Sequence, residues 1–298
     1  MRFGCSNPIK WGCPDLNRGR HLIRKSSPEG GSLPNWPTTP VACNKVYIDV
    51  FIGFIMDFVL EIVKKVMEKK PYSCIDRNFV LKIASKIKAD DDEEKIKLIR
   101  AKLRKISTSV LPLNFYKKFD KIAFSDDSFK MHKSVKERME IYPWLVDEIK
   151  KRGKSIVDLG CGFNLLALKH FGFVPKYYIG YDVDCAVVKF VERFAKENKI
   201  NAEVFCSDIS DIGLGESDIY LCLKVFDALE DYEMGMTKRI LEVIKEKTSH
   251  IIASFSTKSL GGRKMLRERD WFEKTLDNLG MRFVKEKKNG EIFYFIDL

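Results

Sequence analysis

Short apolar runs alternate with longer helical stretches through the second half of the chain, from residue 155 onward. The runs that we interpret as buried strands are Ile156–Leu159, Tyr177–Tyr181, Glu203–Cys206, Ile219–Leu223 and Ile251–Phe255. Between them, Val187–Ala195 and Met236–Ile244 have the apolar spacing of helices. Strand, helix and strand repeated in this way require crossover connections, which build a parallel sheet with helices on both faces. The sequence therefore predicts an α/β, doubly wound sheet.

The end of the chain departs from this pattern. Two apolar segments, Met281–Lys285 and Ile292–Ile296, flank Lys288, Asn289 and Gly290. Asn-Gly between two strands is the strongest short-range signal for a β-hairpin. A parallel sheet closed by an antiparallel C-terminal hairpin is similar to the class I S-adenosylmethionine-dependent methyltransferase fold, which is the fold class that we expect, with a small helical N-terminal domain added.

The region before the sheet has helical periodicity. Phe58, Ile62 and Val66 recur at helical spacing, and the acidic run Asp90–Glu94 fits a helix start, where the macrodipole favours carboxylates. We expect a helical, basic, RNA-binding domain over residues 56–150 and a methyltransferase domain over residues 151–298. The expected RNA-facing side chains are Lys95, Lys97, Arg100, Lys102, Arg104, Lys105, Lys117, Lys118 and Lys121. The alternative for each is an ordinary solvated helix face.

Residues 1–55 have a different composition. Six of the ten prolines of the chain lie there, and neither helical nor strand periodicity is visible. The segment is either a basic arm that touches RNA, a disordered tail, or a mis-assigned start upstream of Met56. The run Trp11–Arg20 resembles spurious translation through a transfer-RNA gene, which favours the third interpretation.

Charge and cysteine content narrow the class of partner. Lysine and arginine number 53 against 42 acidic residues, a net charge of +11, which suits a polyanionic partner. Eight cysteines are scattered without a C-x-x-C pair, so no metal site is expected. Cys161, Cys185, Cys206 and Cys222 fall in apolar segments, which suits reduced thiols and a cytoplasmic protein. The best membrane candidate, residues 47–60, is too short to span a bilayer.

A glycine turn follows the first predicted strand. Asp158, Gly160 and Gly162 form a D-x-G-x-G pattern, in which glycines let the backbone approach a ligand closely. The pattern lacks the Lys-Ser/Thr of a phosphate-binding loop. The alternative is a plain tight turn.

Acidic residues follow the second and third predicted strands. Asp182 lies about twenty positions after the glycines, where a carboxylate holds a ribose diol. Asp208, followed by Ile209, lies where a carboxylate can accept the exocyclic amine of an adenine. The alternative for both acids is a helix cap. Because the carboxyl ends of parallel strands meet at one edge, we expect the glycine turn and both acids to face one ligand crevice.

A motif that the sequence lacks after the fourth strand bears on which atom accepts the methyl group. The segment after the fourth strand, residues 221–227, lacks the Asn/Asp-Pro-Pro-aromatic turn that grips an exocyclic amine. Cys222 is a possible nucleophile towards a pyrimidine, but its apolar strand favours a core position. Guanine N7 carries a lone pair and no proton, so its methylation needs no general base. The segment Ser254–Arg263 can hold a phosphate or a guanine edge; the alternative is a surface loop.

Residues from about 57 to 298 resemble the aminoglycoside-resistance 16S ribosomal RNA methyltransferases, which modify N7 of a guanine in the decoding site. The segment from His132 to Arg138 resembles the family motif H-x-S-x-K-E-R, and Ser254–Arg263 resembles S-F-P-T-[KR]-S-L-G-G-R. The segment Asp158–Ala167 and the pair Leu223-Lys224 match as well. The chain has Asn164-Leu165 and Phe255-Ser256 where the family has Asn-Pro and Phe-Pro, and the exact target base depends on these loops.

This resemblance implies S-adenosylmethionine as the cofactor. The cofactor-binding residues that we expect are His132, Lys133, Ser134, Arg138, Asp158, Gly160, Gly162, Asp182, Asp208 and Ile209, with Arg138 on the cofactor carboxylate. Lys224 and Arg263 are the expected catalytic residues, which orient the base or its phosphate. The expected partner is 16S rRNA in the 30S subunit, bound by a monomer. The alternatives are a methyltransferase of another RNA or of a small molecule, and a non-catalytic RNA-binding or ribosome-assembly factor.

Overall fold

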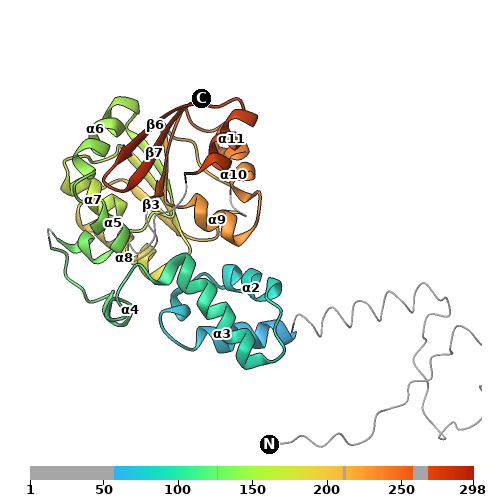
Figure 1. Cartoon of the computed structure of the whole chain (residues 1–298). Coiled ribbons are helices and arrows are strands. Elements are labelled where there is room, and N and C mark those ends of the chain that lie inside the picture. The colour runs from blue at the N-terminus through green and yellow to red at the C-terminus, as the bar shows by residue number, and fades with distance from the viewer. Residues whose placement is uncertain (1–56, 126, 211–212, 258–267) are drawn as a thin grey trace, which may run out of the picture. The chain divides into compact units, whose positions relative to one another are not determined.

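The computed structural model describes residues 57–125, 127–210, 213–257 and 268–298. A seven-stranded sheet runs through its centre in the order β3-β2-β1-β4-β5-β7-β6 (Figure 1). The strands are β1 (Ser155–Leu159), β2 (Tyr177–Asp182), β3 (Ala202–Cys206), β4 (Ile219–Leu223), β5 (His250–Ser256), β6 (Arg282–Lys288) and β7 (Glu291–Asp297). The first five strands pair in parallel, and β7 is antiparallel to both β5 and β6. The predicted doubly wound sheet and its strands are confirmed.

Helices cover both faces of the sheet because neighbouring side chains of each strand point to opposite faces. One face packs against α6 (Tyr142–Arg152), α7 (Asn164–His170) and α8 (Cys185–Glu197). The other face packs against α9 (Phe226–Tyr232), α10 (Met236–Ile244) and α11 (Asp270–Asn278). In β1, Ile156 belongs to the first of these cores and Val157 to the second. Figure 1 shows the two helix groups on either side of the strands.

The C-terminal hairpin has the predicted Asn-Gly turn. Asn289 has φ = 41° and Gly290 has φ = 83°, so both residues occupy the left-handed region that a tight two-residue hairpin turn requires. Glu291 directly follows the turn, and the register of the pair places Lys288 opposite it. The hairpin thereby brings Glu291 to the position on β7 that pairs with Ser256 at the end of β5.

The segment before the sheet is helical, as predicted. A helix runs through residues 57–67 and is followed by η1 (Tyr72–Cys74), α2 (Arg77–Lys86), α3 (Asp92–Leu103), η2 (Arg104–Thr108), α4 (Leu113–Lys118), η3 (Ser128–Met131) and α5 (Lys133–Glu137). Asp91 caps α3 by accepting the amide hydrogen of Glu94, with Asp92, Glu93 and Glu94 in the first turn. The predicted helix start at the acidic run is therefore confirmed.

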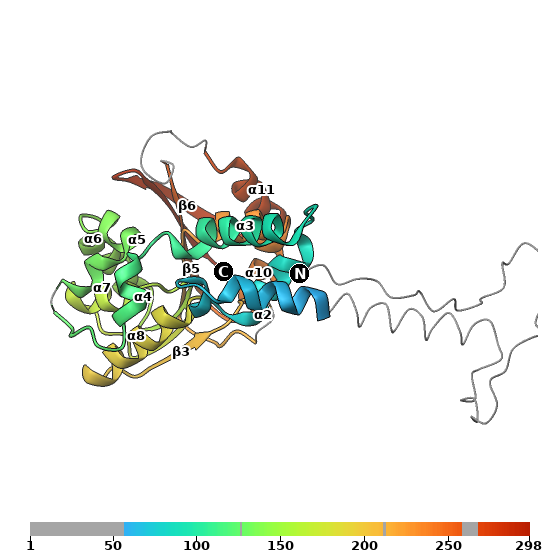
Figure 2. The ribbon, with the colours of Figure 1, turned by 90° about the horizontal axis from the view of Figure 1, so that it is seen from below.

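The buried residues within residues 57–103 pack mainly against one another, and we call this part of the chain the helical layer. Its core includes Ile62, Val66, Val80 and Leu103, which form a cluster of their own. From Leu111 onward, the buried residues of α4, α5 and α6 join the core on the sheet instead. Figures 1 and 2 show α2 and α3 together at one end of the sheet.

The helical layer attaches to the carboxyl ends of the strands through α2. Asp76 donates its backbone N–H to the carbonyl oxygen of Val183 at 2.7 Å, and Ile75 forms an isolated β-bridge with Asp184. The side chain of Asp76 also caps α2 by accepting the amide hydrogen of Phe79. The start of α2 is thus held against the loop that follows β2.

Within the described residues, no helix is long and apolar enough to cross a membrane. The interpretations of residues 1–55 lie outside the part of the chain that the structure describes.

Candidate active site

The glycine turn after β1 forms the floor of a cavity at the carboxyl end of the sheet. Gly160 and Gly162 line this cavity, with φ = 67° and 47°. A Cβ atom on Gly162 would lie 2.8 Å from Nε2 of His132, so a side chain at this position has no room. The Gly162 amide donates to Oδ2 of Asp182 at 3.0 Å, which ties the turn to the end of β2.

Asp182 lines the same cavity and is not a helix cap. The cap of α8 is Asp184, whose side chain accepts the amide hydrogens of Ala186 and Val187. Asp182 instead accepts the amides of Gly162 and Asp184. Burial raises the pKa of the Asp182 carboxyl, and these backbone hydrogen bonds oppose that rise. The alternative interpretation of Asp182 as a cap is therefore wrong.

Asp208 lines the cavity from the segment after β3 and is 6% exposed. Its Oδ1 atom accepts the amide hydrogen of Ser210 at 2.9 Å, and its Oδ2 atom accepts from the Ser210 hydroxyl at 2.7 Å. The ammonium group of Lys82 on α2 lies 2.7 Å from the same Oδ2 atom. No helix follows Asp208 in the described residues before α9, so the cap interpretation is wrong here too. Ile209 also lines the cavity.

Arg138, at the end of α5, is 2% exposed and contributes to the wall of the cavity. Its Nε atom donates to Oε1 of Glu291 at 2.8 Å. Its Nη2 atom is buried and has no hydrogen-bond partner among the described residues. A buried guanidinium N–H group without an acceptor is costly, so this atom indicates a site for an anionic ligand group.

Asn164 connects Arg138 to the first strand. Its amide nitrogen donates to the carboxylate of Asp158, and its amide oxygen accepts from the hydroxyl of Tyr142 at 2.8 Å. Asp158 is fully buried, also accepts from the hydroxyl of Tyr178, and does not line the cavity. Burial raises the pKa of Asp158 to about 7, although the bonds from Tyr178 and Asn164 oppose the rise. The structure thus places Asp158 beneath the glycine turn, where it holds Asn164.

Lys224, directly after β4, lines the cavity close to Arg138. Its Nζ atom lies 3.1 Å from Oε2 of Glu137 and 3.1 Å from Oε2 of Glu291. Its backbone has φ = 61°, a left-handed conformation that is uncommon for lysine. Its amide donates to the carbonyl oxygen of Ser254 at 3.0 Å, which helps to hold that conformation.

The H-x-S-x-K-E-R segment contributes unequally to the cavity. His132 and Ser134 line it, whereas Lys133 does not and instead donates its amide to the carbonyl oxygen of Val110. Burial lowers the pKa of His132 to about 3, with the charges of Arg138 and Lys224 acting in the same direction. The predicted catalytic residue Arg263 lies outside the described residues.

The sequence did not single out several residues that line the cavity or lie beside it. Phe79 from α2, Ser107 from η2 and Tyr232 from α9 line the cavity, and Glu291 joins Arg138 and Lys224 beside it. Helical spacing marked the first part of the chain as a packed layer, but spacing does not show what lies against each helix. The position of Glu291 after the Asn-Gly turn was the available signal for that residue.

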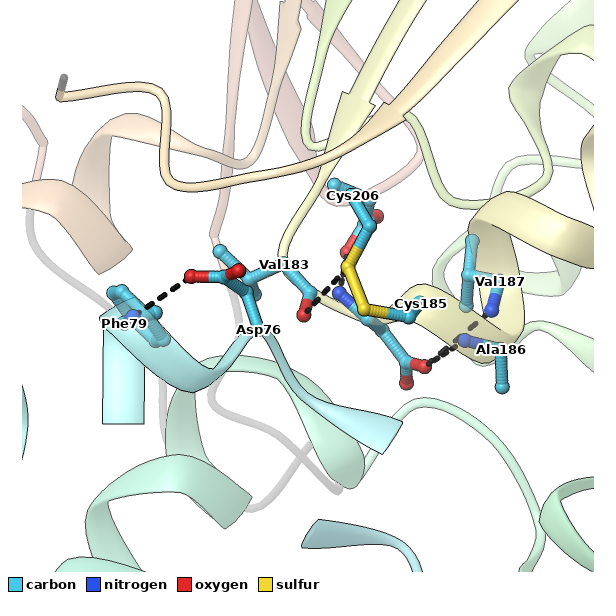
Figure 3. The surroundings of a disulfide bond; sticks show 9 residues. Asp76, Phe79, Val183, Cys185, Ala186, Val187 and Cys206 are labelled. Atoms are coloured by element: carbon cyan, nitrogen blue, oxygen red, sulfur yellow. Dashed lines mark hydrogen bonds between the residues drawn. A yellow bond between two sulfur atoms is a disulfide. The ribbon is translucent and has the colours of Figure 1, made fainter. Parts of the chain in front are cut away.

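A disulfide links Cys185 and Cys206 beside the cavity, with their Cα atoms 4.9 Å apart (Figure 3). The expectation of reduced thiols is wrong for this pair, because the β2–β3 register places Cys206 opposite Asp182 and Cys185 begins α8 three residues later. Cys161 and Cys222 are free and buried, as predicted. Burial raises the pKa of the Cys222 thiol well above its usual range, which confirms a core role for that residue.

These features fit S-adenosylmethionine. The unpaired Nη2 atom of Arg138 suits a carboxylate, Asp182 suits a ribose diol, and Asp208 suits the amino group of an adenine. Gly160 and Gly162 of the glycine turn line the same cavity, where the backbone can approach a ligand closely. The fold is that of the class I S-adenosylmethionine-dependent methyltransferases.

Comparison with known proteins narrows the class to a family. The model of the ribosomal RNA methyltransferase (FmrO) family matches residues 121–292, and the chain belongs to this family. The 16S rRNA (guanine(1405)-N(7))-methyltransferase of Proteus mirabilis is 30% identical over 179 residues, which cover 56% of this chain and 62% of that protein.

Solved structures agree with the fold. The 16S rRNA methyltransferase RmtF in complex with S-adenosyl-L-homocysteine is 19% identical, with a TM-score of 0.70 over 80% of this chain and 97% of that one. The 16S rRNA methylase RmtB is 20% identical, with a TM-score of 0.67 over 80% of this chain and 98% of that one.

Proposed function

We propose that the protein transfers the methyl group of S-adenosylmethionine to N7 of a guanine in the decoding site of 16S rRNA. Membership of a ribosomal RNA methyltransferase family and the named activity of the Proteus mirabilis relative support this proposal. The observation that carries it is a single cavity lined by the carboxylates of Asp182 and Asp208 and by Arg138, whose Nη2 atom has no hydrogen-bond partner among the described residues.

In this proposal Arg138 binds the carboxylate of the cofactor, Asp182 binds the ribose hydroxyls, and Asp208 accepts the amino hydrogen of the adenine. The bound cofactor supplies an activated methyl group on a sulfonium. Glu291 holds Arg138 by a 2.8 Å ion pair, so that the guanidinium cannot turn away from the cavity. The protein contributes orientation and exclusion of water, which are the main requirements for in-line transfer.

The atom that accepts the methyl group is inferred from which side chains could act as a nucleophile or as a general base. Cys222 is fully buried within β4, and burial raises its pKa, so its thiol is unsuited to attack a pyrimidine. His132 stays neutral, but its ring is buried against Gly162, so it has little room to take a proton from a methyl acceptor. Guanine N7 suits this site because it has no proton to lose. Lys224, and Arg263 by resemblance, would orient the base or its phosphate.

The rRNA-binding surface that we propose contains fewer basic residues than the nine that the sequence marked. Arg100 donates to the carbonyl oxygens of Lys65 and Val66, and Lys105 pairs with Asp231, so these two side chains already have partners within the protein. The exposed lysines that remain as candidates are Lys97, Lys117, Lys118 and Lys121. Phosphate contacts from such lysines would make binding weaken steeply with salt. The partner is the 30S subunit in the cytoplasm, approached by a monomer.

The test is methyl transfer from tritium-labelled S-adenosylmethionine to purified 30S subunits, with 50S subunits and a small-molecule pool as comparison substrates. The proposal predicts incorporation into 16S rRNA of 30S subunits. Incorporation into 50S subunits or small molecules would favour another methyltransferase activity. Binding to 30S subunits without any incorporation would instead indicate a non-catalytic ribosome-assembly factor.

A further inference from the structure

The face of α2 that meets the cavity carries both an aromatic and a cationic side chain. Phe79 lines the cavity, is 4% exposed, and its ring centroid lies 5.3 Å from that of Tyr232. Lys82, three residues further on, extends its ammonium group to Asp208. Residues three apart share a helix face, so one side of α2 contributes both Phe79 and Lys82 to the surroundings of the cavity.

The loop after β2 fixes the position of this helix. The Asp76 amide donates to the carbonyl oxygen of Val183 at 2.7 Å, directly after the ribose-binding candidate Asp182. Figure 3 shows Asp76 beside Val183 and the disulfide, with Phe79 hydrogen-bonded to Asp76 on the other side. Helix α2 therefore contacts the ends of both β2 and β3, which carry the two carboxylates of the cofactor site.

The hydrogen-bond donors around Asp208 are distributed unequally between its two carboxylate oxygens. A carboxylate offers about four lone-pair sites, two on each oxygen. Lys82 and the Ser210 hydroxyl occupy Oδ2, at 2.7 Å each, and the Ser210 amide occupies one site on Oδ1. Lys82 also donates to the Ser210 hydroxyl at 3.0 Å, so that Lys82, Ser210 and Asp208 form a closed network of hydrogen bonds. Counting the contacts of the described residues, one site on Oδ1 remains for a ligand.

We propose that Lys82 is a positioning residue for the adenine end of the cofactor site, which fixes the Asp208 carboxylate so that Oδ1 accepts the 6-amino group of adenine. This inference rests on the proposed function and deepens it. It makes the helical layer a part of the cofactor site. The Lys82–Asp208 pair has side chains 28% and 5% exposed, so it lies at the inner edge of the layer and is screened less than a surface pair.

The experiment compares S-adenosylhomocysteine with S-inosylhomocysteine, which has a 6-oxo group in place of the amine, by calorimetry on the full chain. The wild-type protein is expected to prefer S-adenosylhomocysteine, because a carboxylate accepts from an amine and repels a carbonyl oxygen. Lys82→Met is expected to weaken S-adenosylhomocysteine binding about tenfold, the scale of one charge-assisted hydrogen bond, and to reduce the preference by a similar factor.

Two further variants separate positioning from a general structural role. Lys65→Met removes a surface lysine of the same helical layer, which pairs with Asp92, and it should change neither affinity nor preference. The double variant Lys82→Met/Asp208→Asn should show no larger loss of preference than Asp208→Asn alone, because Lys82 acts through Asp208.

Either of two results for Lys82→Met would overturn the inference: unchanged affinity and preference, or an equal loss of affinity for both ligands. A lower melting temperature with intact preference would likewise show a merely structural role. In each of these cases, tight binding of S-adenosylhomocysteine by the wild type still upholds the proposed cofactor. If the wild type binds neither ligand, the proposed function fails and the inference fails with it.

Discussion

The guanidinium of Arg138 and the carboxylate of Glu291 form a buried ion pair, with Nε 2.8 Å from Oε1 and exposed fractions of 2% and 3%. The second oxygen of Glu291 lies 3.1 Å from the ammonium of Lys224. One carboxylate therefore holds both the cation expected to bind the cofactor and the cation expected to orient the base. The opposing charges of Arg138 and Lys224 lower the pKa of Glu291 despite its burial, which acts to raise it.

Glu291→Gln should lower the free energy of unfolding by about 3 kcal/mol, because two cations near the cavity lose their shared counter-ion. The control is Glu137→Gln, which removes the other partner of Lys224 at a site 44% exposed and should cost less than about 1 kcal/mol. Urea denaturation at pH 7.5 measures both values. Equal losses in the two variants would contradict the central role assigned to Glu291.

Gly162→Ala should destabilise the protein and abolish binding of S-adenosylhomocysteine. Its Cβ atom would lie 2.8 Å from the ring of His132, and the backbone there has φ = 47°. The control is Gly172→Ala, which has φ = 81° but no atom within 4 Å of the added Cβ, so it bears the conformational cost of about 1 kcal/mol alone. Thermal unfolding and calorimetry give both readouts, and matching effects at the two positions would refute the steric argument.

Asp182→Ala should abolish cofactor binding and leave the fold intact, because Asp182 lines the cavity and does not cap α8. The variant loses the bond to the Gly162 amide, so a small decrease in melting temperature is expected. Circular dichroism and calorimetry on the same sample separate folding from binding. Unchanged affinity for S-adenosylhomocysteine would show that the carboxylate does not hold the ribose.

Stability should decline in acid partly because of His132. Its pKa in the folded state is about 3, against 6.5 for an ordinary histidine, so below pH 6.5 the unfolded state takes up the proton more readily. The resulting loss is about 1 kcal/mol at pH 5.5 and grows towards pH 3. His132→Gln should show a smaller loss between pH 7.5 and 5.5 than the wild type, whereas His170→Gln, at an exposed position of α7, should keep the wild-type loss. Identical losses in the wild type and His132→Gln would exclude this contribution.

Reduction of the Cys185–Cys206 disulfide should lower stability by about 3 kcal/mol, because the bond closes a loop with a sequence separation of 21. The measurement is the urea midpoint with and without a phosphine reductant. In Cys185→Ser/Cys206→Ser the reductant should have no effect, since the other cysteines of the described residues are free. A wild-type midpoint that does not respond to reductant would show that the bond does not form in solution.

Periodicity predicted the strands and the hairpin because each depends on local chemistry, such as the Asn289-Gly290 turn with its two positive φ angles. The strand-end acids were predicted because parallel strands bring their carboxyl ends together. The contacts of Lys82 and Glu291 depend on how distant segments pack, which helical spacing and strand alternation do not specify. The disulfide was missed for the same reason, since the approach of Cys185 to Cys206 is set by the β2–β3 register.

The proposed reaction is tested by locating the new methyl group in 16S rRNA after 30S subunits react with the protein and S-adenosylmethionine. Reduction with borohydride followed by aniline cleaves RNA at N7-methylguanine, and primer extension then locates the break. One cofactor-dependent break is expected at a guanine of the decoding site, and it should be absent with Asp182→Ala. A methyl group on another atom or outside the decoding site, or none at all while the cofactor binds, would contradict the proposed reaction.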